Sequence, residues 1–143
     1  MSDELLCDPG DKLVLMVDDD ESLLDLMEHV VKKEGFRTDR AADGPEALRK
    51  VQALNPDILV LDMMLPGLGG YEVLRQLQAA GFGGIPIIVV TGRQLDPQGV
   101  ELIRQESNVR EFMAKPVRPP VLAAALHRLL KTSPPPDGRE AGA

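Results

Sequence analysis

Residues 13–20 read LVLMVDDD, five apolar side chains in a row followed directly by three aspartates. An uninterrupted apolar run of this length is typical of a strand that is buried on both faces, as in a parallel sheet covered by helices. Four more segments are strand candidates, the first and last of them weaker: 36–41, 58–61, 85–90 and 110–114. The sequence therefore predicts a sheet with five strands.

Amphipathic segments separate these strand candidates. In residues 21–34, apolar side chains recur at spacings of three and four, which is typical of a helix with one face on a core. The same periodicity occurs in 45–54, 71–80 and 119–130, and more weakly in 97–106. Alternating strands and helices favour parallel strands with right-handed crossovers. The predicted fold class is α/β, a doubly wound five-stranded parallel sheet with helices on both faces.

Acidic residues follow two of the predicted strands. Asp18 and Asp19 come after residues 13–17, and Asp62 comes after residues 58–61. Taken alone, acids at such a place are typical of a solvated helix N-terminus. In doubly wound sheets, however, ligands bind beyond the carboxyl ends of the strands, where these carboxylates would meet. Like charges about 4 Å apart repel by roughly 4 kcal/mol at an effective dielectric constant of 20, so the cluster needs a counter-charge. Mg²⁺, which prefers oxygen ligands, suits it.

Two further strand ends carry groups that complement a phosphate. Thr91 offers a hydroxyl after residues 85–90, and Lys115 offers an ammonium after residues 110–114. A threonine or a lysine at a strand end is commonplace alone. Phosphoryl transfer is indicated by the combination at four strand ends of an acid pair, an acid, a hydroxyl and an ammonium. In that chemistry a carboxylate attacks phosphorus to give an acyl phosphate, and nearby cations offset the charge of the transferring group.

The composition argues against several other classes of protein. The chain has 143 residues with 16 Lys+Arg and 23 Asp+Glu, a net charge of −7, which argues against direct nucleic-acid binding by phosphate neutralisation. The single cysteine, Cys7, excludes an internal disulfide. The sequence shows neither a secretory signal nor an apolar run of the roughly 20 residues that a membrane helix needs. We therefore expect a cytoplasmic protein that is not associated with a membrane.

In this combination the sequence resembles the receiver domain of bacterial two-component response regulators, most of all the single-domain, chemotaxis-regulator-like type. The resemblance rests on LVLMVDDD at 13–20, DMMLPGLGGYE at 62–72, VVTG at 89–92 and FMAKP at 112–116. It implies a flavodoxin-like sheet with strand order 2-1-3-4-5. We expect a receiver domain over 12–131, between an N-terminal tail (1–11) and a Pro-rich flexible tail (132–143).

The resemblance also implies how the acidic cluster works. Asp62 would accept a phosphoryl group from a histidine kinase or a histidine phosphotransfer protein. Mg²⁺ would be coordinated by Asp19, Asp62 and the backbone carbonyl of Met64, with Asp18 acting largely through a metal-bound water. On this basis the protein is a signalling phosphoacceptor in a phosphorelay rather than an enzyme, and it promotes only its own phosphorylation and dephosphorylation.

A switch is implied by the same resemblance. Thr91 and Lys115 would bind the phosphoryl group, and Phe112 would be the aromatic switch that turns inward when Thr91 moves. The peptide bond before Pro116 would be cis, as X-Pro bonds permit. An unknown output protein would bind the face of the fourth helix, fifth strand and fifth helix. One departure is that the family's usual Asp-Gly pair is Gly69-Gly70 here.

The sequence leaves several alternative functions open. The length leaves no room for an output domain, so we expect a stand-alone regulator that switches partner binding, or else a relay shuttle or a degenerate receiver that is not phosphorylated. A flavodoxin-like cofactor binder would not present four acids to a phosphate. A haloacid-dehalogenase-type phosphatase needs a second acid where Met64 stands. His29 and His127 fall in predicted helices, where we expect them to be solvated.

Overall fold

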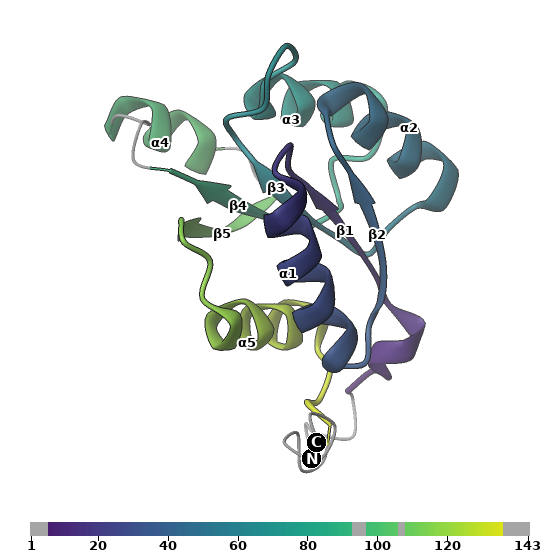
Figure 1. Cartoon of the computed structure of the whole chain (residues 1–143). Helices are drawn as coiled ribbons and strands as arrows, with labels where there is room; N and C mark the ends of the chain where they lie inside the picture. Colours follow the sequence, from purple (N-terminus) through teal and green to yellow (C-terminus); the bar gives the residue numbers. More distant parts are fainter. Residues whose placement is uncertain (1–5, 93–96, 106–107, 136–143) are drawn as a thin grey trace.

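The computed structural model describes residues 6–92, 97–105 and 108–135, and within them a parallel sheet has the strand order β2-β1-β3-β4-β5 (Figure 1). The strands are β1 (Leu13–Val17), β2 (Arg37–Ala41), β3 (Ile58–Asp62), β4 (Ile87–Thr91) and β5 (Val109–Ala114). The helices are α1 (Glu21–Lys33), α2 (Gly44–Leu54), α3 (Gly70–Ala79), α4 (Pro97–Arg104) and α5 (Pro119–Leu130), and a 3-10 turn η2 (Pro9–Asp11) precedes β1. The predicted fold class and strand order are confirmed. Glu106 at the end of the predicted helix 97–106, and residues 1–5 and 136–143 of the predicted tails, lie outside the described residues.

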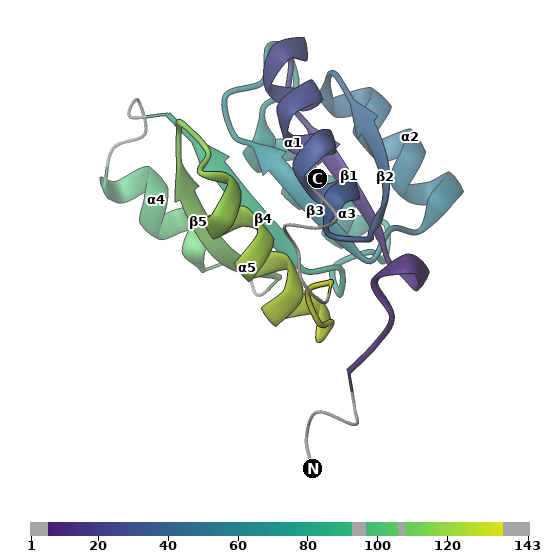
Figure 2. The same ribbon diagram turned by 60° about the horizontal axis from the view of Figure 1, so that its bottom comes forward.

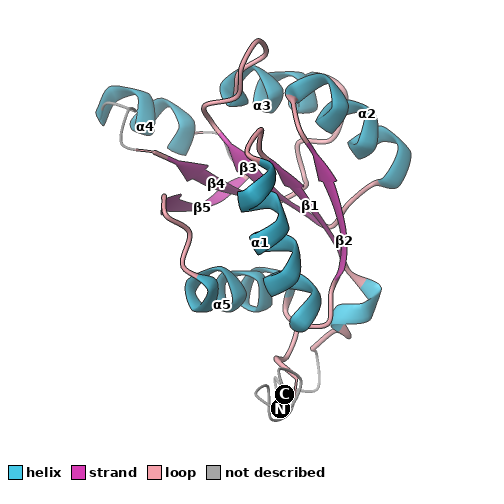
Figure 3. Ribbon diagram, in the orientation of Figure 1, coloured by secondary structure: helices cyan, strands magenta, loops and turns pink. Residues whose placement is uncertain are grey.

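Helices cover both faces of the sheet. Helices α1 and α5 lie on one face, and α2, α3 and α4 lie on the other (Figures 2 and 3). Strands β1, β3 and β4 are buried along their whole length, whereas β2 and β5 at the two edges are partly exposed. Burial on both faces is what produces continuous apolar runs in a sequence. The two edge strands therefore gave the weaker sequence signals.

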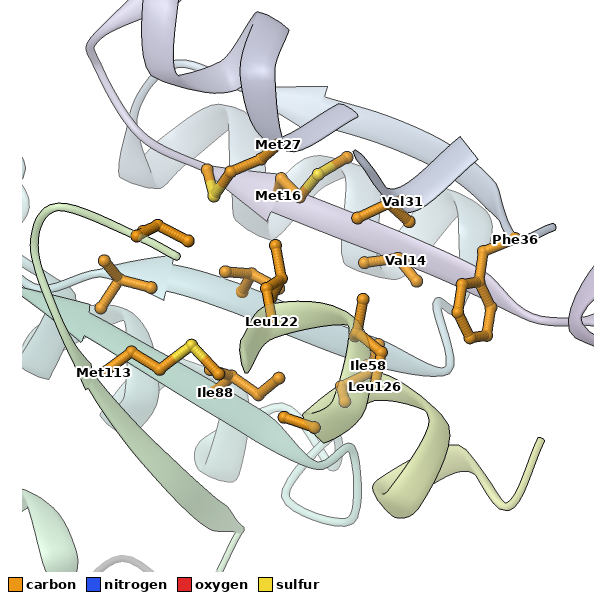
Figure 4. Close-up of a cluster of buried hydrophobic side chains, with 14 of the residues drawn as sticks. Val14, Met16, Met27, Val31, Phe36, Ile58, Ile88, Met113, Leu122 and Leu126 are labelled. Carbon is orange, nitrogen blue, oxygen red and sulfur yellow. The ribbon is translucent and has the colours of Figure 1, made fainter. Parts of the chain in front are cut away.

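Alternate side chains of each inner strand enter different cores, because successive residues of a strand point to opposite faces. Val14 and Met16 of β1 pack with Met27 of α1 and Leu122 of α5 in one cluster (Figure 4). The residue between them, Leu15, belongs to the cluster under α2 and α3. Burying a side chain of this size contributes about 1.5–3 kcal/mol, so these two layers hold the strand ends in place.

The start of β4 differs from the prediction. The apolar run begins at Ile85, but the strand begins at Ile87. Pro86 has no N–H and cannot donate into the ladder, although its carbonyl accepts a hydrogen bond from the Leu59 N–H at 3.1 Å. At the other end the strand extends to Thr91, which pairs with Ala114 of β5.

The expectation that His127 is solvated is wrong. Its side chain is buried between α5 and the end of α1, with Nε2 2.8 Å from Glu34 Oε1 and Nδ1 2.7 Å from Thr132 Oγ1. The ring also lies against Phe36, at 5.0 Å between centroids. The buried Thr132 forms a parallel bridge with Cys7. Periodicity within α5 could not reveal these partners, because Glu34 is 93 residues away in the sequence.

Candidate functional site

The register of the sheet brings the predicted site residues to one edge. Asp62 is the last residue of β3 and pairs with Val90 of β4. One residue beyond β1, the Asp18 N–H still donates to the Ala41 carbonyl at 3.1 Å. Beyond β5, the Lys115 N–H donates to the Thr91 carbonyl at 2.9 Å. The ladders therefore continue just past the strand ends and fix the backbone of each candidate residue.

Three carboxylates meet at this edge. Asp18 and Asp62 are buried, with 0% and 2% of their surface exposed, and Asp19 is exposed. One oxygen from each lies within 4.8 Å of the others. This is the cluster that the sequence predicted from two neighbouring strand ends. Two of its members have little contact with water, so their charges are poorly screened.

Lys115 faces the two buried carboxylates. Its Nζ lies 3.1 Å from Asp18 Oδ2 and 3.4 Å from Asp62 Oδ2. The peptide bond between Lys115 and Pro116 is cis. One ammonium therefore lies between two carboxylates, which leaves the buried part of the cluster with a net negative charge.

The second oxygen of each buried carboxylate is held by the backbone. Asp18 Oδ1 accepts the Asp20 N–H at 2.9 Å, and Asp62 Oδ1 accepts the Met64 N–H at 3.0 Å. Asp20 itself caps α1, because its side chain accepts the N–H groups of Ser22 and Leu23. The consecutive aspartates thus have different roles: Asp18 forms the site and Asp20 starts the helix.

The charges of the cluster are incompletely compensated. Burial raises the pKa of Asp18 above its ordinary value, the Asp20 N–H opposes that shift, and the charge of Asp62 adds to it. Burial would lower the pKa of Lys115, but its pairing with the carboxylates of Asp18 and then Asp62 outweighs burial and raises it. Asp18 Oδ2 is fully buried and accepts no well-aligned hydrogen bond, although the ammonium is close. An all-oxygen cluster with such an atom fits a divalent cation such as Mg²⁺.

The loop between β3 and α3 is closely packed behind the cluster. A Cβ added at Gly70 would lie 2.6 Å from Met63 Sδ and 2.9 Å from the Asp62 carbonyl oxygen, so a side chain does not fit there. A Cβ at Gly69 would meet nothing within 4 Å. Only the second glycine of the Gly69-Gly70 pair is therefore required by packing next to Asp62. Helix α3 begins at Gly70, one residue before the predicted start at Tyr71.

Thr91 and Phe112 lie on the neighbouring strands β4 and β5. The Thr91 hydroxyl donates to the Gly92 carbonyl at 3.1 Å. Phe112 is half-buried against the cluster that includes Ile103 of α4, and the guanidinium carbon of Arg104 lies 4.8 Å from the centroid of its ring. The structure thus brings Asp18, Asp19, Asp62 and Lys115 together, while these two side chains have other partners.

Residues 14–127 match the family model described as the response regulator receiver domain. The chain belongs to this receiver family. Its bacterial relatives include the DNA-binding response regulator MtrA of Mycobacterium tuberculosis, which is 38% identical over 118 residues, or 82% of this chain and 50% of MtrA. The transcriptional regulatory protein PhoP of Bacillus subtilis, named for alkaline phosphatase synthesis, is 34% identical over 122 residues, or 85% of this chain and 50% of PhoP. The receiver chain spans about half the length of the curated relatives it matches.

Solved receiver structures have the same fold. Chemotaxis protein CheY4 of Vibrio cholerae superposes with a TM-score of 0.75 at 27% identity, covering 83% of this chain and 97% of CheY4. A CheY-like receiver domain protein from Methanospirillum hungatei JF-1 gives a TM-score of 0.76 at 27% identity, covering 83% and 93%. The family resemblance predicted from the sequence is confirmed.

Sequence reasoning about this receiver did not find Arg104. Arginine in the last turn of a helix is commonplace, and Phe112 stands eight positions further along the chain. No spacing rule links two residues across a helix-to-strand connection, so the contact becomes visible only when α4 is placed on the sheet. Within residues 6–92, 97–105 and 108–135, none of the helices combines the length and the hydrophobicity needed to cross a bilayer.

Proposed function

We propose that this receiver accepts a phosphoryl group on Asp62 in a Mg²⁺-dependent reaction, with a histidine kinase or a histidine phosphotransfer protein as donor. The observation that carries the proposal is the position of Asp62: it is buried among carboxylates, with Oδ2 3.4 Å from Lys115 Nζ and Oδ1 fixed by the Met64 N–H. A carboxylate whose direction is fixed and that lies next to a cation is suited to attack phosphorus.

The reaction forms one bond and breaks another. An oxygen of the Asp62 carboxylate attacks the phosphorus of a phosphohistidine, the phosphorus–nitrogen bond breaks, and its electron pair returns to the imidazole, which takes up a proton. The product is an acyl phosphate on Asp62. Because the transferring group carries negative charge, the ammonium of Lys115 stabilises it where it arrives. The Met64 N–H keeps the carboxylate oriented.

The acidic residues hold the metal in this proposal. Asp19, Asp62 and the backbone carbonyl of Met64 would hold Mg²⁺, with Asp18 acting largely through a metal-bound water. When bound, Mg²⁺ supplies positive charge that offsets the oxygens of the phosphoryl group. Asp18 also holds Lys115 in place by the 3.1 Å ion pair, so its two roles are to attract the metal and to position the ammonium.

The phosphorylated receiver then changes the surface that partners contact. The Thr91 hydroxyl leaves the Gly92 carbonyl for a phosphoryl oxygen, and Phe112 follows it inward. Both residues lie next to the face formed by α4, β5 and α5, where Leu102 and Val121 expose apolar side chains. That face binds the output protein in one of the two states. That this receiver acts without an output domain in the same chain stays a prediction, because the match covers only half the length of the curated relatives.

Intact-mass measurement with acetyl phosphate as donor tests the proposal. The wild-type protein should gain one phosphoryl group when Mg²⁺ is present and none when EDTA replaces it. Asp62→Asn should gain none. The matched control is Asp25→Asn, the same exchange at an exposed aspartate that pairs with Arg40 on the surface, and it should behave as wild type. A wild-type protein that gains nothing with Mg²⁺ would establish a degenerate receiver, and a modified Asp62→Asn protein would show that another residue is the acceptor.

A phosphorelay shuttle is the alternative use of the same chemistry. The two uses differ in what happens after phosphorylation. A shuttle passes its phosphoryl group rapidly to a histidine phosphotransfer protein, whereas a switch binds its target more tightly when phosphorylated. Following the loss of label from the phosphorylated receiver, with and without such a protein, separates them.

A further inference from the structure

Arg104 and Phe112 form a contact that the proposed chemistry does not use. The guanidinium carbon of Arg104 lies 4.8 Å from the centroid of the Phe112 ring, within the distance at which a cation is attracted to an aromatic face. Within the described part of the chain, Arg104 pairs with no carboxylate, in contrast to Arg40 and Arg128. The described partner of this guanidinium is therefore the aromatic ring.

The residue next to Arg104 fixes this geometry. Ile103 is buried in the core cluster under α2, α3 and α4, and Phe112 packs against the same cluster. The buried isoleucine anchors the last turn of α4 on the sheet, and so the side chain of its exposed neighbour can lie over the ring. The contact thus joins a fixed helix end to a half-buried ring on β5.

The ring is close in the fold to the proposed phosphoryl site. Phe112 lies opposite Val89 of β4, and two residues further along the same pair of strands Thr91 lies opposite Ala114. Lys115 directly follows the end of β5, and its N–H donates a hydrogen bond to the Thr91 carbonyl. Any inward movement of the ring therefore takes place beside the hydroxyl and the ammonium that would bind the phosphoryl group.

We propose that the observed contact belongs to the resting position of Phe112 and is lost when the ring moves inward, so that Arg104 is a positioning residue that sets how readily this receiver enters its phosphorylated state. The inference rests on the proposed function, in which the ring moves inward on phosphorylation. A contact made only in the resting state lowers the population of the other state. If phosphorylation proceeds from that other state, its rate falls by the same factor as the population. Cation–π contacts at exposed positions shift an equilibrium by about two- to five-fold, which is the size of effect expected here.

Two measurements test the inference. Labelling with 4-fluorophenylalanine gives fluorine NMR signals for the three phenylalanines, and the Phe112 signal is the one lost in Phe112→Leu. Arg104→Met removes the charge and keeps the aliphatic stem, so the resting Phe112 signal should shift towards its position in the phosphorylated protein. In unlabelled protein, acetyl phosphate should phosphorylate Arg104→Met about two- to five-fold faster than wild type. Arg104→Lys keeps a cation and should lie closer to wild type in both measurements.

Arg128→Met is the matched control, because it removes an arginine that pairs with Glu111, the neighbour of Phe112, at 2.6 Å without touching the ring. An Arg104→Met protein that matches wild type in signal and rate overturns the inference. So does an equal acceleration in Arg128→Met, which would show that surface charge sets the rate. If wild type is not phosphorylated at all, the proposed function fails. The resting NMR signal then decides the Arg104 contact separately: an unshifted Phe112 signal in Arg104→Met overturns it as well.

Discussion

Replacing Lys115 by methionine removes the ammonium from the acidic cluster and keeps the aliphatic stem. At an effective dielectric constant of 20, unit charges at the observed 3.1 and 3.4 Å attract by about 5 kcal/mol each. Breaking a buried ion pair typically costs about 3–5 kcal/mol, because a buried charge is left without a partner. The lysine side chain is 29% exposed, and the raised pKa of Asp18 makes its protonation easier, so we expect a loss of about 2–3 kcal/mol.

Lys50→Met is a close control for this change. The Lys50 side chain is also 29% exposed and also faces two carboxylates, Asp39 at 3.0 Å and Glu46 at 3.5 Å. Those carboxylates are about one-third exposed, whereas Asp18 and Asp62 are buried. Solvent-exposed pairs contribute roughly 0–1 kcal/mol, so Lys50→Met should cost at most about 1 kcal/mol. Lys50 Nζ also donates to the Arg40 carbonyl at 2.6 Å, so a larger loss in Lys115→Met than in Lys50→Met points to the burial of Asp18 and Asp62 and not to the number of partners lost.

Urea unfolding of the two variants in EDTA and in Mg²⁺ measures both effects. Because the metal replaces the missing positive charge, Mg²⁺ should recover at least about 1 kcal/mol of the Lys115→Met deficit and none of the Lys50→Met deficit. Lys115→Met should still bind Mg²⁺ but be phosphorylated poorly by acetyl phosphate. If Lys115→Met is as stable as wild type in EDTA, or if its deficit is unchanged by Mg²⁺, the electrostatic account of the cluster is wrong.

Three further changes test other parts of the structure. Gly70→Ala should destabilise the protein by about 2 kcal/mol because its Cβ collides with the preceding loop, whereas Gly69→Ala should change urea stability by less than about 0.5 kcal/mol. The pKa of Asp18 is raised above 3.8 in the folded state, so Asp18 binds a proton more tightly when the protein is folded. Its contribution to stability in EDTA should therefore fall as the pH rises above about 3.8 through the folded pKa. Glu28, whose pKa is lowered, contributes with the opposite sign, so the measured quantity is the difference between wild type and Asp18→Asn in pH-dependent thermal unfolding. His127→Ala should cost about 2 kcal/mol in urea, because it leaves two hydrogen-bond partners unpaired, while the exposed His29→Ala should cost almost nothing.

Local patterns and one topological rule were sufficient for the fold class and for the edge of the sheet where the acidic cluster lies, while the strand order 2-1-3-4-5 came from the family resemblance. Apolar runs mark inner strands, and the residue after each run lies at the carboxyl edge of the sheet. Asp18 and Asp62 therefore had to lie near each other once β1 and β3 were neighbours. The position of Lys115 follows in the same way from β5. None of these inferences requires knowledge of a side-chain direction.

What could not be predicted depends on contacts between distant segments and on side-chain rotamers. The C-cap residue of α1, Glu34, lies against His127 and forms a hydrogen bond with its ring. The sequence of α5 contains no pattern that predicts this contact. The contact between Arg104 and Phe112 depends on how α4 sits on the sheet. The direction of the Thr91 hydroxyl is a rotamer. The sequence therefore predicts which carboxylates meet at the sheet edge better than it predicts the side-chain contacts of His127, Arg104 and Thr91.

The incomplete neutralisation of the cluster links stability to the proposed activity. Two buried carboxylates share one ammonium, and one buried oxygen of Asp18 has no well-aligned hydrogen bond. Replacing Asp18 by a neutral side chain would remove that cost, but it would also release Lys115 and weaken the attraction for Mg²⁺. The same negative charge that lowers the stability of the metal-free protein therefore provides the affinity for a cation. Because a phosphoryl group on Asp62 adds further negative charge, the metal and the phosphoryl group should favour each other's presence at this edge of the sheet.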